Sequence, residues 1–266
     1  MENDRVELLD HGYLQFIERW GGDDRIIEAA RMSTGKGFLG WGPITRCKHC
    51  RLAVHPNDPN KWHPYVTQEQ MGCEHERETV SGDEKLLRYL YENRHSTPFE
   101  MAGMVIEVQA PIMVFREWHR HRTQSFNEMS ARYIPLPNDN YVPTNERLLI
   151  NSKTNKQAGV IKGADELTED KAEWFRQGLE KQYEQQQKFY EEALQAGVSK
   201  ELARLHIGVG RYSRMRASAN LRNWLAFLTL RMDTKVQWEI RMYANEVGSL
   251  IAKLFPRTWK LFAESL

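Results

Sequence analysis

The sequence REWHRHRTQSFNEMSARY, residues Arg116–Tyr133, is the most distinctive stretch of this 266-residue chain. It holds four arginines and two histidines among serine, asparagine and aromatic residues. Guanidinium groups bind phosphates and planar imide or carboxylate groups through paired hydrogen bonds, and the rings of Trp118, Phe126 and Tyr133 offer stacking faces. The stretch predicts a pocket for a phosphorylated aromatic ligand such as a nucleotide. The competing interpretation is a solvated helix face laced with ion pairs.

The overall charge and hydropathy exclude several classes of protein. With 37 Lys+Arg against 36 Asp+Glu, the chain does not have the excess of positive charge expected of a protein that coats nucleic acid. No stretch approaches the ~20 apolar residues of a membrane helix, and the acidic, polar start does not resemble a secretory signal. We therefore expect a cytoplasmic globular protein that has neither a membrane nor a nucleic acid as its partner.

Outward from Arg116–Tyr133, helical patterns outnumber strand patterns. Apolar residues alternate in strand fashion over residues 104–108, and Pro111 opens a helix that reaches about residue 121. Further helices are expected over residues 25–31, 83–94, 166–196, 221–230 and 236–254. This mixture, with helix dominant, predicts an α+β fold.

The segment 41–79 has a different composition from the rest of the chain. It contains all three cysteines, Cys47, Cys50 and Cys73, and it lacks helical or strand periodicity. Three thiolates and an imidazole, that of His75, suit a tetrahedral structural zinc ion. The segment is therefore predicted to be an inserted, loop-rich, zinc-binding-like module. Three free thiols or a redox pair are the alternatives, and the fourth ligand could instead be His49, His55 or His63.

Several motifs together resemble one known family. Arg120-His121-Arg122, seven residues and then Ser130 is similar to the R-H-R-x7-S signature of flavin-dependent thymidylate synthases. The resemblance extends over nearly the whole chain except residues 41–79, so one domain over 1–266 with an insertion at 41–79 is expected. The other matching elements are Ala29-Ala30-Arg31-Met32-Ser33, His95-Ser96-Thr97-Pro98-Phe99-Glu100, Glu201-Leu202-Ala203-Arg204, the stretch from Asn220 to Arg231, and Gln237-Trp238-Glu239-Ile240.

This resemblance implies a fold, a reaction and an assembly. Members of the family arrange helices around an antiparallel sheet. They convert dUMP to dTMP with methylenetetrahydrofolate as carbon donor, FAD as hydride carrier and NADPH as reductant. They are homotetramers whose active sites form between subunits.

The resemblance also implies roles for individual residues. The residues expected to bind FAD are Ser33, His95, Thr97, Glu100, Arg120, His121, Arg122, Glu128, Asn220 and Arg222. The residues expected around the substrate dUMP are Glu117, Trp118, His119, Arg120, Glu128, Met129, Ser130, Ala131, Arg132, Arg204 and Arg231. Arg231 is the expected catalytic residue, because the family uses this position to polarise the uracil.

These expectations agree with the chemistry of the residues. Methylation at C5 of uracil requires a nucleophilic C5, which a cysteine can generate by adding to the ring. No cysteine lies near the signature, and an arginine on the imide can instead stabilise the developing enolate-like charge. Ser130 lies among arginines, where a contact with the nucleotide phosphate is more reasonable than a nucleophilic role.

Three positions depart from the pattern of many relatives. Glu117 stands where glutamine is common, Ala131 where glycine is common, and Ala226 where asparagine often contacts the flavin. A carboxylate at position 117 would repel an anionic nucleotide unless an arginine paired with it or it were protonated. Flavin-dependent C5 modification of another pyrimidine deoxynucleotide, and a non-catalytic nucleotide-binding relative, therefore stay open as alternatives.

Overall fold

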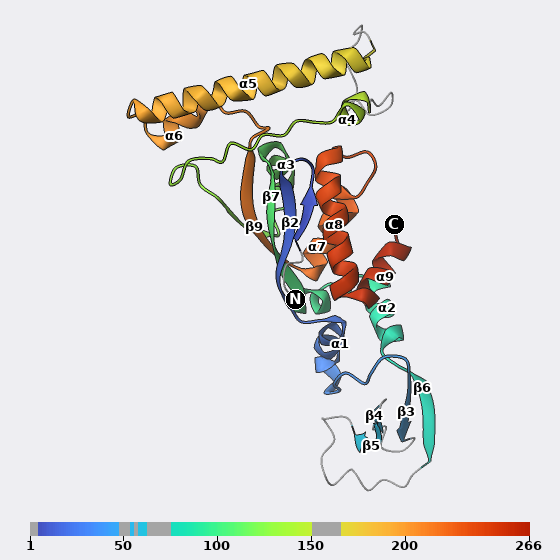
Figure 1. Cartoon of the computed structure of the whole chain (residues 1–266). Helices are drawn as coiled ribbons and strands as arrows, with labels where there is room; N and C mark the ends of the chain where they lie inside the picture. Colours follow the sequence, from blue (N-terminus) through green and yellow to red (C-terminus); the bar gives the residue numbers. More distant parts are fainter. Residues whose placement is uncertain (1–4, 48–53, 56–57, 63–75, 151–165) are drawn as a thin grey trace. The chain divides into compact units, whose positions relative to one another are not determined.

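The computed structural model describes residues 5–47, 54–55, 58–62, 76–150 and 166–266. It has an α+β fold with an antiparallel sheet, which confirms the predicted fold class (Figure 1). The contacts divide the chain into two compact units. The first unit comprises Met1–Glu18, Val105–Ser218 and Phe227–Val247, and the second comprises Arg19–Met104, Ala219–Ala226 and Gly248–Leu266. None of the described helices is long and apolar enough to cross a membrane.

The main sheet has five strands in the order β1-β2-β7-β9-β8. Burial alternates along β7 and β9, so one face of these strands contributes to the core. Met215 and Ala217 point inward on β9, whereas Arg214 and Arg216 are exposed. The strands are β1 (Arg5–Leu8), β2 (Gly12–Trp20), β7 (Gly103–Pro111), β8 (Ser125–Glu128) and β9 (Tyr212–Asn220).

The helices match most of the predicted segments. The long helix α5 (Glu169–Gln195) begins where the Thr168 side chain accepts a hydrogen bond from the Lys171 backbone N–H, and it ends before Gly197, whose φ is +86° (Figure 1). The helices associated with the first unit are α3 (Ile112–Trp118), α4 (Asn145–Leu149), α5, α6 (Lys200–Ala203) and the 3-10 turn η4 (Arg204–His206). Two apolar helices follow β9, namely α7 (Leu221–Arg231) and α8 (Trp238–Leu254).

In the second unit, a buried aspartate joins two helices that are distant in sequence. Asp23 opens α1 (Asp23–Arg31), and its carboxylate accepts hydrogen bonds from the backbone N–H groups of Arg257 and Thr258 at 2.9 and 3.2 Å. It thereby caps α9 (Pro256–Glu264) at its positive end. The other helical elements of this unit are η1 (Met32–Thr34), α2 (Glu84–Glu92) and η3 (Thr97–Met101).

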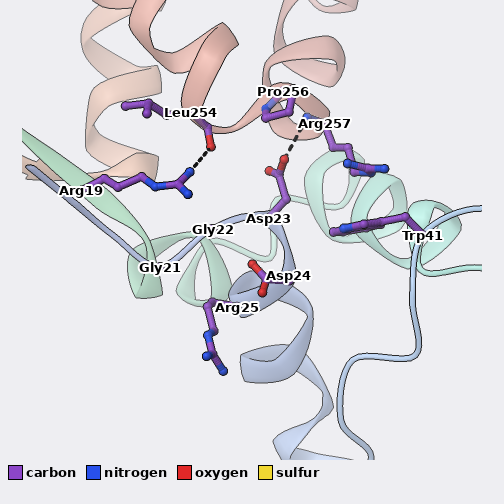
Figure 2. Close-up of a pocket in the computed structure, with 10 residues that line it drawn as sticks. All are labelled: Arg19, Gly21, Gly22, Asp23, Asp24, Arg25, Trp41, Leu254, Pro256 and Arg257. Carbon is purple, nitrogen blue, oxygen red and sulfur yellow. Dashed lines mark hydrogen bonds between the residues drawn. The ribbon is translucent and has the colours of Figure 1, made fainter. Parts of the chain in front are cut away.

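A polar pocket of about 370 Å³ lies beside this cap. Figure 2 shows Asp23 directed at Arg257, and Arg19 directed at the carbonyl oxygen of Leu254, 2.8 Å away. The Arg257 guanidinium lies 4.4 Å from the centre of the Trp41 ring, which is a cation–π contact. These interactions join the start of α1, the end of α8, the start of α9 and Trp41, the first residue of the segment 41–79.

The described part of segment 41–79 contains two short strand pairs. β3 (Pro43–Cys47) pairs antiparallel with β6 (Arg77–Ser81), and β4 (Val54–His55) pairs with β5 (Asp58–Trp62). The backbone of Cys47 closes β3, but three of the predicted zinc ligands, Cys50, Cys73 and His75, lie outside the described residues. No group of three or more metal-binding side chains occurs among the residues that are described. The zinc site therefore stays a prediction.

Candidate active site

The signature forms a helix, a turn and a short strand in the first unit. Helix α3 buries Val114, Phe115 and Trp118, and the chain turns before β8, which pairs with β9. Because the apolar residues of α3 are anchored in the core, the polar residues at its end and in the turn are held in fixed positions. The predicted ligands therefore lie on a helix end and the adjoining loops, where functional side chains are common.

Trp118 is a core residue of this arrangement. Its indole is fully buried, stacks on Phe227 with ring centroids 4.7 Å apart, and donates from Nε1 to Oε1 of Gln124 at 3.0 Å. The indole face is therefore occupied by Phe227, so a contact of residue 118 with a nucleotide would have to come from its backbone. By contrast, Tyr133 is 78% exposed.

The central feature is the environment of Arg231, the last residue of α7. Its Nε donates to Nε2 of His121 at 2.8 Å, its Nη1 to the Glu117 carboxylate at 2.7 Å, and its Nη2 to the Glu117 carbonyl at 2.9 Å. The arginine side chain is only 14% exposed, whereas that of Glu117 is 44% exposed. The carboxylate that the sequence placed near an anionic nucleotide is thus paired with an arginine.

His121 is held as a neutral acceptor. Burial and the positive charge of Arg231 lower its pKa to about 4, although Glu117 acts in the opposite direction. Since Nε2 accepts the hydrogen bond from Arg231, the ring proton of the neutral form is on Nδ1. The ring also meets Phe227 edge-on at 4.9 Å.

Arg132, one of the predicted substrate residues, lines a cleft of about 590 Å³ in the first unit. The cleft is lined by Arg132, Tyr133, Lys200 and Glu201, together with residues at the end of α5. Arg132 donates from Nε to Glu201 at 3.1 Å, and Lys200 donates to the Tyr133 carbonyl at 2.8 Å. Two cations and one carboxylate therefore line one open cleft, and the two cations make it a suitable environment for a phosphate group.

The remaining signature residues have mixed exposure. Glu128 accepts a hydrogen bond from the Ser213 hydroxyl at 2.7 Å, and the Ser130 hydroxyl accepts one from the Arg132 backbone N–H at 3.4 Å. Ala131 is buried. The exposed positions are His119, Arg120, Arg122 and Glu128, and the half-buried ones are Met129, Ser130 and Arg204.

The second unit contains the other predicted flavin residues. His95 and Thr97 line a pocket of about 290 Å³ with Ala30 and Leu90. The Arg222 guanidinium donates to the Glu100 carboxylate in a close ion pair. Asn220 caps α7, because its Oδ1 accepts from the Asn223 backbone N–H at 2.9 Å.

Two further residues of the second unit lie on its surface, namely Ser33, which was predicted to bind FAD, and Ala226, which departs from the pattern of many relatives. Ser33 is exposed in η1, where its hydroxyl donates to the Ala30 carbonyl at 3.3 Å. Ala226 is exposed on α7. Four predicted flavin ligands, Arg120, His121, Arg122 and Glu128, belong instead to the first unit.

Some contributors to the site could not be found from the sequence. Ser213 carries no signal of its own, and its contact with Glu128 forms only in the folded chain. Gln124 lies within the signature but is not one of its matching residues, and its hydrogen bond with Trp118 is set by the fold. Glu201 is part of a recognised motif, but its pairing with Arg132 is set by the fold.

Known proteins resemble this chain over nearly its whole length. The family model described as "Thymidylate synthase complementing protein" (Thy1) matches residues 15–257. The flavin-dependent thymidylate synthase of Rickettsia bellii is 30% identical over 271 residues, covering 97% of this chain and 78% of that protein. The enzyme of the same name from Thermosipho africanus is 30% identical over 256 residues, covering 96% and 92%.

Two solved structures are similar in both fold and sequence. They show a UMP/dUMP methylase, PolB from Streptomyces cacaoi. The structure bound with 5-Br dUMP has a TM-score of 0.69 and 28% identity, and it covers 97% of both chains. The structure bound with 5-Br UMP has a TM-score of 0.71 and 26% identity, covering 97% of this chain and 96% of that one. This chain belongs to the flavin-dependent thymidylate synthase family, as its Arg120-His121-Arg122 signature predicted.

Proposed function

We propose that the protein methylates dUMP at C5 to give dTMP, with methylenetetrahydrofolate as carbon donor, FAD as hydride carrier and NADPH as reductant. The observation that carries this proposal is the fixed guanidinium of Arg231, held by Glu117 and His121 at the end of the signature helix. Family membership supports the reaction type.

Arg231 would act on the imide of the uracil. Three of its five N–H groups are engaged by Glu117 and His121, and the two others can point to a ligand. A guanidinium placed on the imide favours ionisation at N3 and stabilises the negative charge that makes C5 nucleophilic. This route needs no cysteine nucleophile, and the three cysteines of the chain all lie within residues 47–73, far from the signature in sequence.

The phosphate of the nucleotide would be bound by cations of the same unit. Arg132 and Lys200 line the cleft, and Arg204 follows in η4. A phosphate would compete with Glu201 for Arg132, since both are anions and the existing pair is largely exposed. Fixing the phosphate orients the ring and lowers the entropic barrier of the reaction.

The residues present fit the phosphate-rich, aromatic flavin cofactor. Arg222 supplies a cation, Asn220 and Thr97 supply polar groups, and His95 borders a pocket of about 290 Å³. When bound, the flavin supplies the hydride that converts the transferred carbon to a methyl group. The task of the protein is then to bind, orient and polarise the reactants.

The surface of α5 supports the proposal of a homotetramer with active sites between subunits. Trp174 is 74% exposed, and Phe175 and Phe189 are also exposed. Large apolar side chains on one long helix are typical of an interface with another chain. We further propose that the chain is one catalytic domain in which residues 41–79 form a zinc-stabilised insertion, and that the enzyme works in the cytoplasm.

A second candidate function is C5 methylation of another pyrimidine nucleotide. The similar methylase is described as acting on UMP as well as dUMP, and it was solved with 5-Br UMP. The glutamate at position 117, where many relatives have glutamine, is a further reason to test both nucleotides. A non-catalytic nucleotide-binding role is the third alternative.

Release of tritium from C5-labelled nucleotide tests these proposals. With FAD, NADPH and methylenetetrahydrofolate present, we expect release from [5-³H]dUMP and the appearance of dTMP, and omission of FAD or of folate should abolish dTMP formation. Turnover of [5-³H]UMP with none of dUMP would move the assignment to the second candidate. A purified protein with no flavin absorbance after incubation with FAD would support the third.

A further inference from the structure

We infer that Glu117 is a positioning residue that fixes the guanidinium plane of Arg231 and reduces the positive charge that this arginine presents to the pyrimidine. The inference rests on the proposed role of Arg231. It assigns Glu117 to the arginine rather than to the nucleotide, where the sequence pattern placed it.

The geometry of the end of α3 supports the orienting part of this role. Glu117 contacts Arg231 twice, through its carboxylate at 2.7 Å and its carbonyl at 2.9 Å. His121, four residues later, accepts from Nε at 2.8 Å. Three acceptors from five consecutive residues engage all three nitrogens of one planar group, so the plane cannot rotate unless a hydrogen bond is lost.

The rigidity of the acceptors is part of the same argument. Glu117 is adjacent to Trp118, which is fully buried and stacked on Phe227. The His121 ring is also packed against Phe227. The two acceptor residues are therefore fixed by one aromatic core, and the arginine takes its orientation from them.

The charge of Glu117 supports the second part of the inference, which is that Glu117 reduces the positive charge that Arg231 presents to the pyrimidine. The carboxylate and the guanidinium form a close pair in which Arg231 is largely buried, so solvent screens their interaction less than on an open surface. A carboxylate at 2.7 Å from Nη1 offsets part of the positive potential that the guanidinium would exert on a ligand. A glutamine could retain the hydrogen bond through its amide oxygen but would leave the arginine charge uncompensated. The residue type at this position therefore sets the strength with which Arg231 can ionise N3.

The test uses two variants, Glu117→Gln and Glu117→Ala, in the full-length FAD-loaded protein, with 5-bromo-dUMP as the probe. The apparent pKa of N3 in the bound probe is read from its ultraviolet absorbance. We expect Glu117→Gln to lower this pKa by about one unit relative to wild type, because a negative charge is removed beside the guanidinium. An N3 pKa unchanged in Glu117→Gln would overturn the charge role.

The kcat values of the two variants distinguish the orienting role of Glu117 from the effect of its charge. Glu117→Ala removes both the charge and the carboxylate hydrogen bond, whereas Glu117→Gln removes only the charge, so we expect the kcat of Glu117→Ala to lie at least about tenfold below that of Glu117→Gln. Equal kcat values for the two variants would overturn the orienting role. Thermal melting and flavin content are measured alongside, so that loss of fold is not mistaken for loss of orientation.

A readout without nucleotide distinguishes this inference from the proposed function. The ¹⁵N shift of His121 Nε2 reports whether the nitrogen accepts a hydrogen bond, and it should change in Glu117→Ala but little in Glu117→Gln. If the three proteins show this pattern but the wild type does not bind 5-bromo-dUMP, the proposed function is refuted and the orienting contact is retained. A Nε2 shift identical in all three proteins would refute the orienting contact itself.

Discussion

The Nε–H of Arg231 donates to Nε2 of His121 across 2.8 Å, so the imidazole serves as an uncharged acceptor for a cation. A protonated ring could not accept this bond and would repel the guanidinium. Burial acts in the same direction, and the pKa of His121 is lowered to about 4. The histidine of the signature thus helps to hold Arg231 in place.

This contact predicts how stability depends on pH. In the unfolded chain His121 binds a proton below pH ~6.5, whereas in the folded chain it does so only below about pH 4. Between these values the unfolded state binds more protons, so the free energy of unfolding rises with pH across this window. The contribution of His121 to stability is lost as the pH falls through the same window. Solvent screens this half-exposed ring, so the expected contribution is about 1 kcal/mol.

Urea unfolding at pH 4.5 and pH 7 checks this prediction. The stability of wild type should fall by about 1 kcal/mol more than that of His121→Gln between these pH values, since the amide does not titrate. Parallel losses in the two proteins would show that His121 titrates normally in the folded chain.

Replacing Arg231 should remove catalysis more than binding. For Arg231→Ala we expect kcat for tritium release from [5-³H]dUMP to fall at least about 100-fold, which is typical for the loss of one electrostatic donor in an active site. The Kd for dUMP should change only a few-fold, because the phosphate is expected to bind elsewhere in the unit. Arg5→Ala, which removes an exposed arginine of the edge strand β1, is the matched control and should keep wild-type turnover. Unchanged turnover in Arg231→Ala would refute its polarising role.

The sequence predicted those features of the site that depend on nearby residues. The helix expected over residues 166–196 is observed as α5 (Glu169–Gln195), and the helix expected from Pro111 to about residue 121 is observed as α3 (Ile112–Trp118), each to within a few residues. These signals are local, since a helix is capped and a turn is formed by neighbours in the chain. The α+β class followed from the same local patterns.

Other features depend on contacts between distant residues and could not be predicted. Glu117 and Arg231 are 114 positions apart, and nothing in either segment specifies their pairing. Strand β9 was not predicted because its exposed Arg214 and Arg216 alternate with residues of modest size such as Ala217, so its hydrophobic periodicity is weak. Trp118 was considered for stacking on a ligand, but the fold places Phe227 against its face.

The flavin proposal predicts that Arg222 contributes to cofactor affinity. Its guanidinium is exposed beside Glu100 and can bind a phosphate group of the cofactor. Arg222→Ala should raise the Kd for FAD by about 10- to 100-fold, the equivalent of one lost charge-assisted hydrogen bond. Quenching of flavin fluorescence during titration measures this. Arg88→Ala is the control, because Arg88 pairs with Glu92 and Glu264 rather than with a predicted ligand, and equal affinities for the two variants would contradict the assignment.

The zinc proposal predicts one zinc ion per chain. Metal analysis of protein purified without added zinc should give about one equivalent for wild type and much less for Cys47→Ser, because the thiolate is the preferred ligand type. Single substitutions of His75, His49, His55 and His63 by glutamine then identify the fourth ligand, since only the true ligand should reduce the zinc content. Equal zinc content in wild type and Cys47→Ser, or no zinc in either protein, would refute the proposal of a zinc-stabilised insertion.

The final prediction concerns Asp83, which anchors the chain where the segment 41–79 meets α2. Asp83 is 1% exposed, and its carboxylate accepts from the Leu39 backbone N–H at 2.7 Å and from the Arg31 guanidinium in a close ion pair. Its own N–H donates to the Gly40 carbonyl at 2.9 Å. Because Arg31 is only 18% exposed, Asp83→Ala would leave a largely buried cation without this carboxylate.

Removing one partner of a buried ion pair is costly, so we expect Asp83→Ala to lower the free energy of unfolding by about 3 kcal/mol. Urea denaturation measures this value. Glu92→Ala, which removes the carboxylate of an exposed pair with Arg88, serves as the control and should change it by less than about 0.5 kcal/mol. A loss below 1 kcal/mol in Asp83→Ala would mean that Arg31 regains its solvation when the carboxylate is removed, and that the anchor depends on the backbone bond to Gly40 instead.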